Sequence, residues 1–114
     1  MQYNFNMLNT SLTPTQLAQM IDSTFLKPYG KDEDIARHCA EARRYGFAMV
    51  AIHPAEVGRC AQLLQGSPVR VGAAIGFPLG QNTTEVKLFE IKDAISRGAG
   101  EIDMVINIRA LQKS

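Results

Sequence analysis

The residues best suited to chemistry lie in residues 101–107, a short apolar stretch with a carboxylate near its centre. Side chains of an extended strand alternate between two faces, so Asp103 shares a face with Glu101, Val105 and Asn107. Burying an unpaired carboxylate is costly. Asp103 is therefore either a structural group bonded to a neighbouring backbone or a catalytic carboxylate at the mouth of an α/β enzyme.

A second polar pair lies near the start of the chain. Residues 21–27 are predicted to form a strand, and Asp22 and Thr24 lie on one face of it. Two interpretations stay open for this pair. The two residues could form a cap displaced into a loop, or they could belong to an active site.

The elements that position these groups alternate between helix and strand. Thr13, Pro14 and Gln16 predict a capped first helix. Asn82, with Glu85 three residues later, predicts the start of a later helix in the same way. The remaining periodicity predicts helices over 32–45 and 55–65, strands over 21–27, 47–52, 69–75 and 101–107, and a short tail over 108–114.

Alternating strands and helices predict an α/β fold with a parallel sheet and right-handed crossovers. Four such units do not close a (β/α)₈ TIM barrel, which needs eight strands. We expect a flexible tail over residues 1–12 and a partial barrel of about four parallel βα units, preceded by a helix, over 13–114. Its polar inner face would carry Asp22, Thr24, Asp103 and Asn107, and its two edge strands would be unpaired.

Charge and composition argue against several classes of protein. The net charge of +1 offers no electrostatic basis for binding nucleic acid or a membrane surface, and no apolar run is long enough for a membrane span. The two cysteines fall in helical patterns, which argues against a disulfide scaffold, so we expect a cytoplasmic location. The two cysteines and two histidines lack metal-site spacing, so we expect no metal. We interpret His53 as a structural or solvent-facing strand-end residue, His38 as a surface residue, and Lys87 and Lys92 as solvated.

Four segments, in this order and spacing, resemble deoxyribose-phosphate aldolase. They are residues 21–28 (IDSTFLKP), residues 45–48 (YGFA) leading to Pro54, residues 75–87 (IGFPLGQNTTEVK) and residues 101–107 (EIDMVIN). The resemblance implies a TIM-barrel lyase of deoxyribonucleotide catabolism that uses no metal or other cofactor. Its reaction is the reversible cleavage of 2-deoxy-D-ribose 5-phosphate to D-glyceraldehyde 3-phosphate and acetaldehyde, through a Schiff base on a lysine.

The resemblance also implies roles for individual residues. Asp103 occupies the position of the aspartate that holds a water and relays protons, and Asp22 matches an acidic position of the first strand. We further expect Thr24 and Asn107 to contact substrate. The chain departs from the family pattern at Ser23, where many members have histidine, and at Ala51, where some have cysteine.

The resemblance places both catalytic lysines, and the phosphate site, beyond Ser114, so no Schiff-base lysine is expected within this chain. We therefore expect a truncated, N-terminal half of an aldolase that is inactive alone, whose full-length relatives bind a small phosphorylated sugar. It would form a homo-oligomer or lack its C-terminal half. Two rival interpretations are a self-associating half-barrel that acts as a binding or scaffold protein, and an aggregation-prone fragment without a function.

Overall fold

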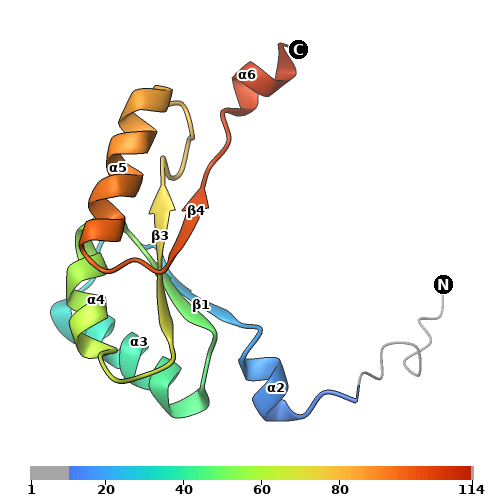
Figure 1. Ribbon diagram of the computed structural model, residues 1–114, viewed down its shortest axis with the longest axis vertical. Coiled ribbons are helices and arrows are strands. Elements are labelled where there is room, and N and C mark those ends of the chain that lie inside the picture. Colours follow the sequence, from blue (N-terminus) through green and yellow to red (C-terminus); the bar gives the residue numbers. More distant parts are fainter. Residues whose placement is uncertain (1–10, 114) are drawn as a thin grey trace.

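The computed structural model describes residues 11–113. It contains one open sheet whose successive strands are connected by helices (Figure 1). The predicted tail over 1–12 lies almost wholly outside the described residues. The elements, in chain order, are α2 (Pro14–Ala18), β1 (Asp22–Phe25), α3 (Asp32–Tyr45), β2 (Met49–Ile52), η1 (Pro54–Glu56), α4 (Val57–Leu63), β3 (Arg70–Ile75), α5 (Thr84–Ser96), β4 (Glu101–Met104) and α6 (Ile108–Gln112).

The four strands are parallel and follow the order β1-β2-β3-β4, so β1 and β4 are the two edges. This confirms the predicted parallel sheet of alternating strands and helices. The register pairs Thr24 with Ala51, Ala51 with Gly72, and Ala74 with Asp103. Paired residues of a sheet point to the same face, so these side chains share one side of the sheet.

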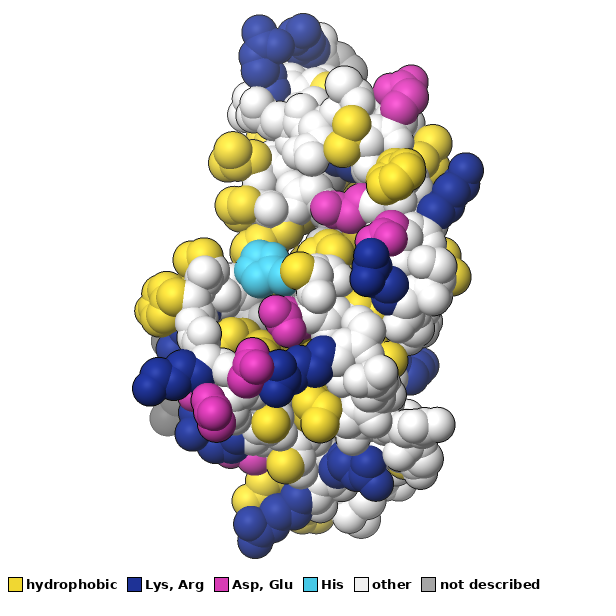
Figure 2. All heavy atoms as spheres, turned by 90° about the vertical axis from the view of Figure 1, so that its left-hand side faces the viewer, with side chains coloured by type: hydrophobic (Ala, Val, Ile, Leu, Met, Phe, Trp, Pro, Cys, Tyr) yellow, Lys and Arg dark blue, Asp and Glu magenta, His cyan; other side chains and the backbone are white. Residues whose placement is uncertain are grey.

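The three long helices α3, α4 and α5 all cover the other side of the sheet (Figure 1). Val50, Ile52, Val71, Ala73 and Ile75 point to that side and pack with helix residues in one apolar cluster. The cluster members from the helices and the cap of α4 are Ile35, Cys39, Ala42, Val57, Cys60, Leu64 and Ala94. The outer surface of the helices alternates charged side chains with scattered apolar ones (Figure 2). One-sided coverage is the arrangement of a barrel wall, so the fold is a partial TIM barrel.

Local signals account for most helix ends. Thr13 and Gln16 form the predicted capping box of α2, and Gly46 ends α3 in the left-handed conformation with φ of 69°. The cap predicted at Asn82 is wrong. Thr83 caps α5 instead, because it is the last extended residue and its hydroxyl accepts from the Val86 N–H at 3.3 Å.

Two predicted segments differ from the structure. The helix predicted over 55–65 begins with a turn of 3₁₀-helix, η1, at Pro54 before α4. The tail predicted over 108–114 instead starts a short helix, α6, because the Asn107 side chain accepts from the Ala110 N–H at 3.0 Å and caps it. Among the described residues, no helix combines the length and hydropathy that a membrane span requires.

Candidate active site

The open side of the sheet carries a hollow of about 420 Å³ that we call the inner hollow. It is lined by Asp22, Thr24, Leu26, Ala51, Ala74, Phe77, Ile102, Asp103, Met104 and Val105. These residues come from all four strands and from the loop after β3. In α/β barrels, residues at the carboxyl ends of the strands form the active site. The inner hollow is therefore the candidate site.

The central strands present small side chains to the floor of the inner hollow. Ala51 and Ala74 are nearly buried, and Gly72 has no side chain at all. A Cβ on Gly72 would lie 2.7 Å from the Sδ atom of Met49, which is fully buried on this face. The missing side chain thus lets Met49 fill the lower part of the sheet while the upper part stays open.

Asp103 stands on β4 at the rim of this floor, next to Ala74 in the register. Its side chain is exposed, and within residues 11–113 its carboxylate has no hydrogen bond or ion pair. Glu101, two residues earlier on the same face, is engaged by Arg70 at 2.8 Å. Asp103 thus faces the hollow and is free to bind a ligand or a water molecule, and the structure gives no backbone bond to its carboxylate.

Asp22 and Thr24 lie on β1, at the opposite edge of the sheet, and both line the inner hollow. The Thr24 hydroxyl donates to the Asp22 carbonyl at 3.0 Å within the strand. The interpretation of the two residues as a cap in a loop is therefore wrong, because a regular strand contains both of them. The sequence correctly predicted that Asp22, Thr24 and Asp103 share one face of the sheet.

Asn107 does not line the inner hollow. Strand β4 ends at Met104, so the alternation of side chains expected through residue 107 stops earlier. The Asn107 amide oxygen is used to cap α6. Its contact with substrate stays a prediction.

Both histidines contact the backbone of β1 or of the residues that follow it. His53 contacts the Leu26 carbonyl through Nε2 at 2.9 Å and packs edge-on against Phe77, with 5.7 Å between ring centroids. A carbonyl only accepts, so Nε2 of His53 carries the proton. The prediction of a surface position for His38 is wrong. His38 is half-buried against β1, and its Nε2 lies 2.8 Å from the Ser23 carbonyl oxygen.

The prediction that Lys87 is solvated is also wrong. Lys87 on α5 is only 9% exposed, and its ammonium donates to the Val105 carbonyl at 2.9 Å. Lys92 on the same helix is exposed, as predicted. Helix periodicity gave no indication of the Lys87 contact, because its acceptor is a backbone atom 18 residues later.

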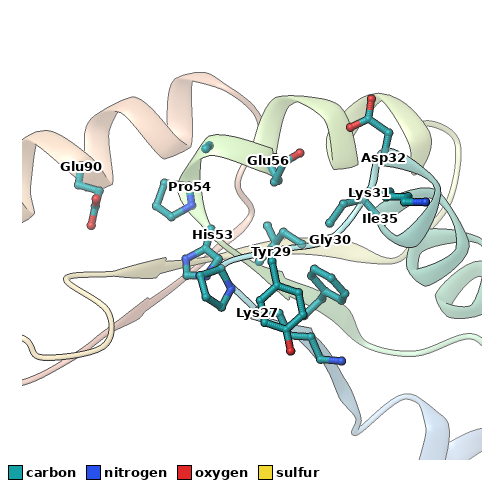
Figure 3. Close-up of a pocket in the computed structure, with 14 residues that line it drawn as sticks. Lys27, Tyr29, Gly30, Lys31, Asp32, Ile35, His53, Pro54, Glu56 and Glu90 are labelled. Carbon is teal, nitrogen blue, oxygen red and sulfur yellow. The ribbon is translucent and has the colours of Figure 1, made fainter.

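A second cavity, of about 540 Å³, lies among the loop after β1, η1 and α5 (Figure 3). Its labelled side chains include two lysines and three carboxylates, so charges of both signs line the wall. Glu90 is bonded to the Gly76 N–H at 2.7 Å, and Asp32 is paired with Arg59 at 2.8 Å. These groups therefore hold the loops together.

The described residues contain no group of three or more histidine, cysteine or acidic side chains placed to hold a metal ion. Cys39 of α3 and Cys60 of α4 are free and buried in the helix layer. A hydrogen bond between their thiols lowers the pKa of Cys39 and raises that of Cys60, where burial acts in the same direction. Both thiols lie on the side of the sheet opposite to the inner hollow.

No protein-family model matches the chain. The chain is 66% identical over 110 residues to the deoxyribose-phosphate aldolase of Bacteroides thetaiotaomicron, an alignment that covers 96% of this chain and 46% of that protein. It is 57% identical over 97 residues to the corresponding aldolase of Clostridium perfringens, covering 85% of this chain and 43% of that protein. The chain thus spans a little under half the length of these curated relatives.

Solved structures agree with this match. A crystal structure of a candidate deoxyribose-phosphate aldolase from Coccidioides immitis superposes with a TM-score of 0.87 at 40% identity, over 91% of this chain and 41% of that one. The deoxyribose-phosphate aldolase of Aeropyrum pernix, described as a tetramer, gives a TM-score of 0.80 at 37% identity, over 86% and 42%. In sequence and in fold, the chain therefore matches the N-terminal half of deoxyribose-phosphate aldolases.

Proposed function

We propose that the chain forms the first four βα units of a deoxyribose-phosphate aldolase barrel and supplies one wall of its active site. The reaction is the cleavage of 2-deoxy-D-ribose 5-phosphate to D-glyceraldehyde 3-phosphate and acetaldehyde, in the cytoplasm and within deoxyribonucleotide catabolism. The observation that carries the proposal is the unpartnered carboxylate of Asp103 in the inner hollow of a chain that matches these aldolases.

In this proposal Asp103 relays protons. A carboxylate that is not held by an ion pair can orient a water molecule and exchange protons with the carbon that is attacked or released. Asp22 and Thr24, across the hollow on β1, would accept and donate hydrogen bonds to substrate hydroxyl groups. The small floor residues Ala51 and Ala74 leave room for the sugar chain between the two edges.

The amine that attacks the substrate carbonyl comes, in this proposal, from residues outside the 114. None of the lysines in the described part of the chain lines the inner hollow. Lys87 is occupied by the Val105 carbonyl, and Lys27 and Lys31 line the second cavity instead. A Schiff base needs a free amine close to the carbonyl, so the 114-residue chain alone is expected to form none.

Borohydride trapping tests this proposal. The 114-residue chain is incubated with 2-deoxyribose 5-phosphate and sodium borohydride, and its mass is measured before and after. The Bacteroides thetaiotaomicron aldolase, treated in parallel, serves as the positive control and should gain a stable adduct. We expect the mass of the 114-residue chain to stay unchanged. A stoichiometric adduct that maps to one lysine would refute the proposed origin of the amine.

A second candidate function is a self-associating half-barrel that serves as a scaffold or binding protein. The observation that favours it is the pair of edges, because within residues 11–113 β1 and β4 each have a strand partner on one side only. Apolar side chains such as Met104 and Ile106 are more than half exposed at the β4 edge. Two copies would supply eight parallel strands with two-fold symmetry. Light scattering tests this candidate, and a folded, strictly monomeric species would count against it.

A further inference from the structure

We propose that Lys87 is a positioning residue, which fixes the end of β4 and thereby sets where Asp103 stands in the inner hollow. The proposal rests on the proposed role of Asp103 for its functional meaning. Its first support is the burial of the Lys87 side chain, which is 9% exposed, and the 2.9 Å hydrogen bond from its Nζ to the Val105 carbonyl. A lysine stem usually leads its ammonium to water, whereas this one ends on a backbone oxygen.

A second support comes from Glu90, which lies three residues later on α5. Its Oε1 accepts from the Gly76 N–H at 2.7 Å. Opposite charges at this spacing commonly pair with each other on a helix. Among the described residues, Lys87 and Glu90 form no such pair, and each bonds to the first residue after a strand. One face of α5 therefore holds the carboxyl ends of both β3 and β4.

The glycines of the loop after β3 make this arrangement possible. A Cβ on Gly76 would lie 3.1 Å from the Lys87 Cε atom, so the glycine leaves space for the lysine stem. A Cβ on Gly80 would collide with the Ile106 carbonyl oxygen. The loop thus packs directly on the chain that leaves β4, and it would not fit there with ordinary side chains at both positions.

Val105 is held by hydrogen bonds at both of its backbone polar groups. Its N–H donates to the Ile75 carbonyl at 2.9 Å, and its carbonyl accepts from Lys87. Asp103 is two residues earlier on the same face, and both residues line the inner hollow. Among the described residues, β4 is an edge strand with a neighbour on one side only. The Lys87 bond therefore holds its carboxyl end from the helix side.

Amide hydrogen exchange and carbon NMR on the 114-residue chain test the proposal. The variant Lys87→Met removes the ammonium and keeps most of the stem, and Lys92→Met on the exposed side of α5 is the matched control. In Lys87→Met we expect the Val105 amide to exchange about ten-fold faster, with the Val50 amide of β2 unchanged, and the Asp103 carboxyl carbon signal to shift. Lys92→Met should match the unsubstituted chain in all three readouts.

A second variant separates positioning from folding. Lys87→Gln keeps an N–H donor on a side chain that is one bond shorter, and it should change the Val105 and Asp103 signals in the same direction. Unchanged Val105 and Asp103 signals in folded Lys87→Met or Lys87→Gln would overturn the proposal. So would unfolding of both variants, which would assign Lys87 to stability alone. These signals need no turnover, so the result is independent of the borohydride experiment.

Discussion

Ile75 and Met104 are neighbours in the register of β3 and β4 and point to the same side of the sheet, yet their surroundings differ sharply. Ile75 is fully buried under the helix layer, whereas Met104 is 51% exposed. The helices therefore cover β3 fully, whereas on β4 they cover Ile102 in part and leave Met104 half exposed. The candidate catalytic carboxylate lies on an edge strand with little apolar cover, so its position depends on polar contacts such as that of Lys87.

The largest expected difference in the free energy of unfolding is between truncation of Ile75 and truncation of Met104. Ile75→Ala removes buried apolar contacts and leaves a cavity, so we expect a loss of about 2–5 kcal/mol in the free energy of unfolding. Met104→Ala removes a half-exposed side chain and should cost less than about 1 kcal/mol. Urea unfolding followed by circular dichroism measures both values. Equal losses would mean that β4 is as well packed as β3, contrary to the comparison.

An intermediate effect on the free energy of unfolding is expected on the inner face, where Gly72 and Met49 pack tightly. A Cβ on Gly72 would lie 2.7 Å from the Met49 Sδ and 2.8 Å from its Cε. Gly72→Ala should therefore force Met49 to move and cost about 1–3 kcal/mol in unfolding free energy. Gly58→Ala on α4 is the control, since nothing lies within 4 Å of its Cβ.

Gly58→Ala should stabilise the chain by up to about 1 kcal/mol, because alanine is the better helix former. Thermal and urea unfolding give the sign of each change. If Gly72→Ala were neutral, the Met49 side chain would be loosely held, and the floor of the inner hollow would not be fixed by packing.

The smallest expected effect concerns the pH dependence of α3. The Lys31 N–H donates to Asp34 at 2.8 Å, and this bond, together with the nearby Arg37, lowers the pKa of Asp34 below its usual value of 3.8. A lowered pKa stabilises the fold above the unfolded value, and this stabilisation is lost as the pH falls through the folded value. Asp34→Asn should therefore weaken the dependence of stability on pH below about 4.

Urea midpoints measured between pH 6 and pH 2.5 check this, with Glu41→Gln on the exposed side of α3 as the control. The control should keep the acid dependence of the unsubstituted chain. An unchanged acid slope in Asp34→Asn would show that the Lys31 contact does not form in solution.

The sequence predicted the parts of the molecule that depend on local pattern. Alternating strands and helices and the Gly46 stop signal are properties of neighbouring residues, and the structure confirms them. The side of the sheet that carries Asp103 follows from the period of two in a strand, and the structure agrees. These local rules were enough to place Asp22, Thr24 and Asp103 on one face of the sheet.

The parts that escaped prediction depend on contacts between distant residues. From the sequence alone Lys87 is predicted to be a solvated helix lysine, because its hydrogen-bond acceptor, the Val105 carbonyl, lies 18 residues later. The half-buried position of His38 likewise involves a contact with Ser23, which lies 15 residues away. The shift of the helix cap from Asn82 to Thr83 reflects the usual uncertainty of one residue at helix ends. The periodicity of residues around Lys87 or His38 does not indicate these distant contacts.

The most direct test joins this chain to the amine that it is proposed to serve. The 114 residues are fused to the part of the Bacteroides thetaiotaomicron aldolase that follows the aligned region, and cleavage of 2-deoxyribose 5-phosphate is measured. The account predicts that the fusion cleaves the substrate and that Asp103→Asn lowers kcat by about 10²-fold or more, without loss of folding. Equal turnover by the folded Asp103→Asn fusion would contradict the account.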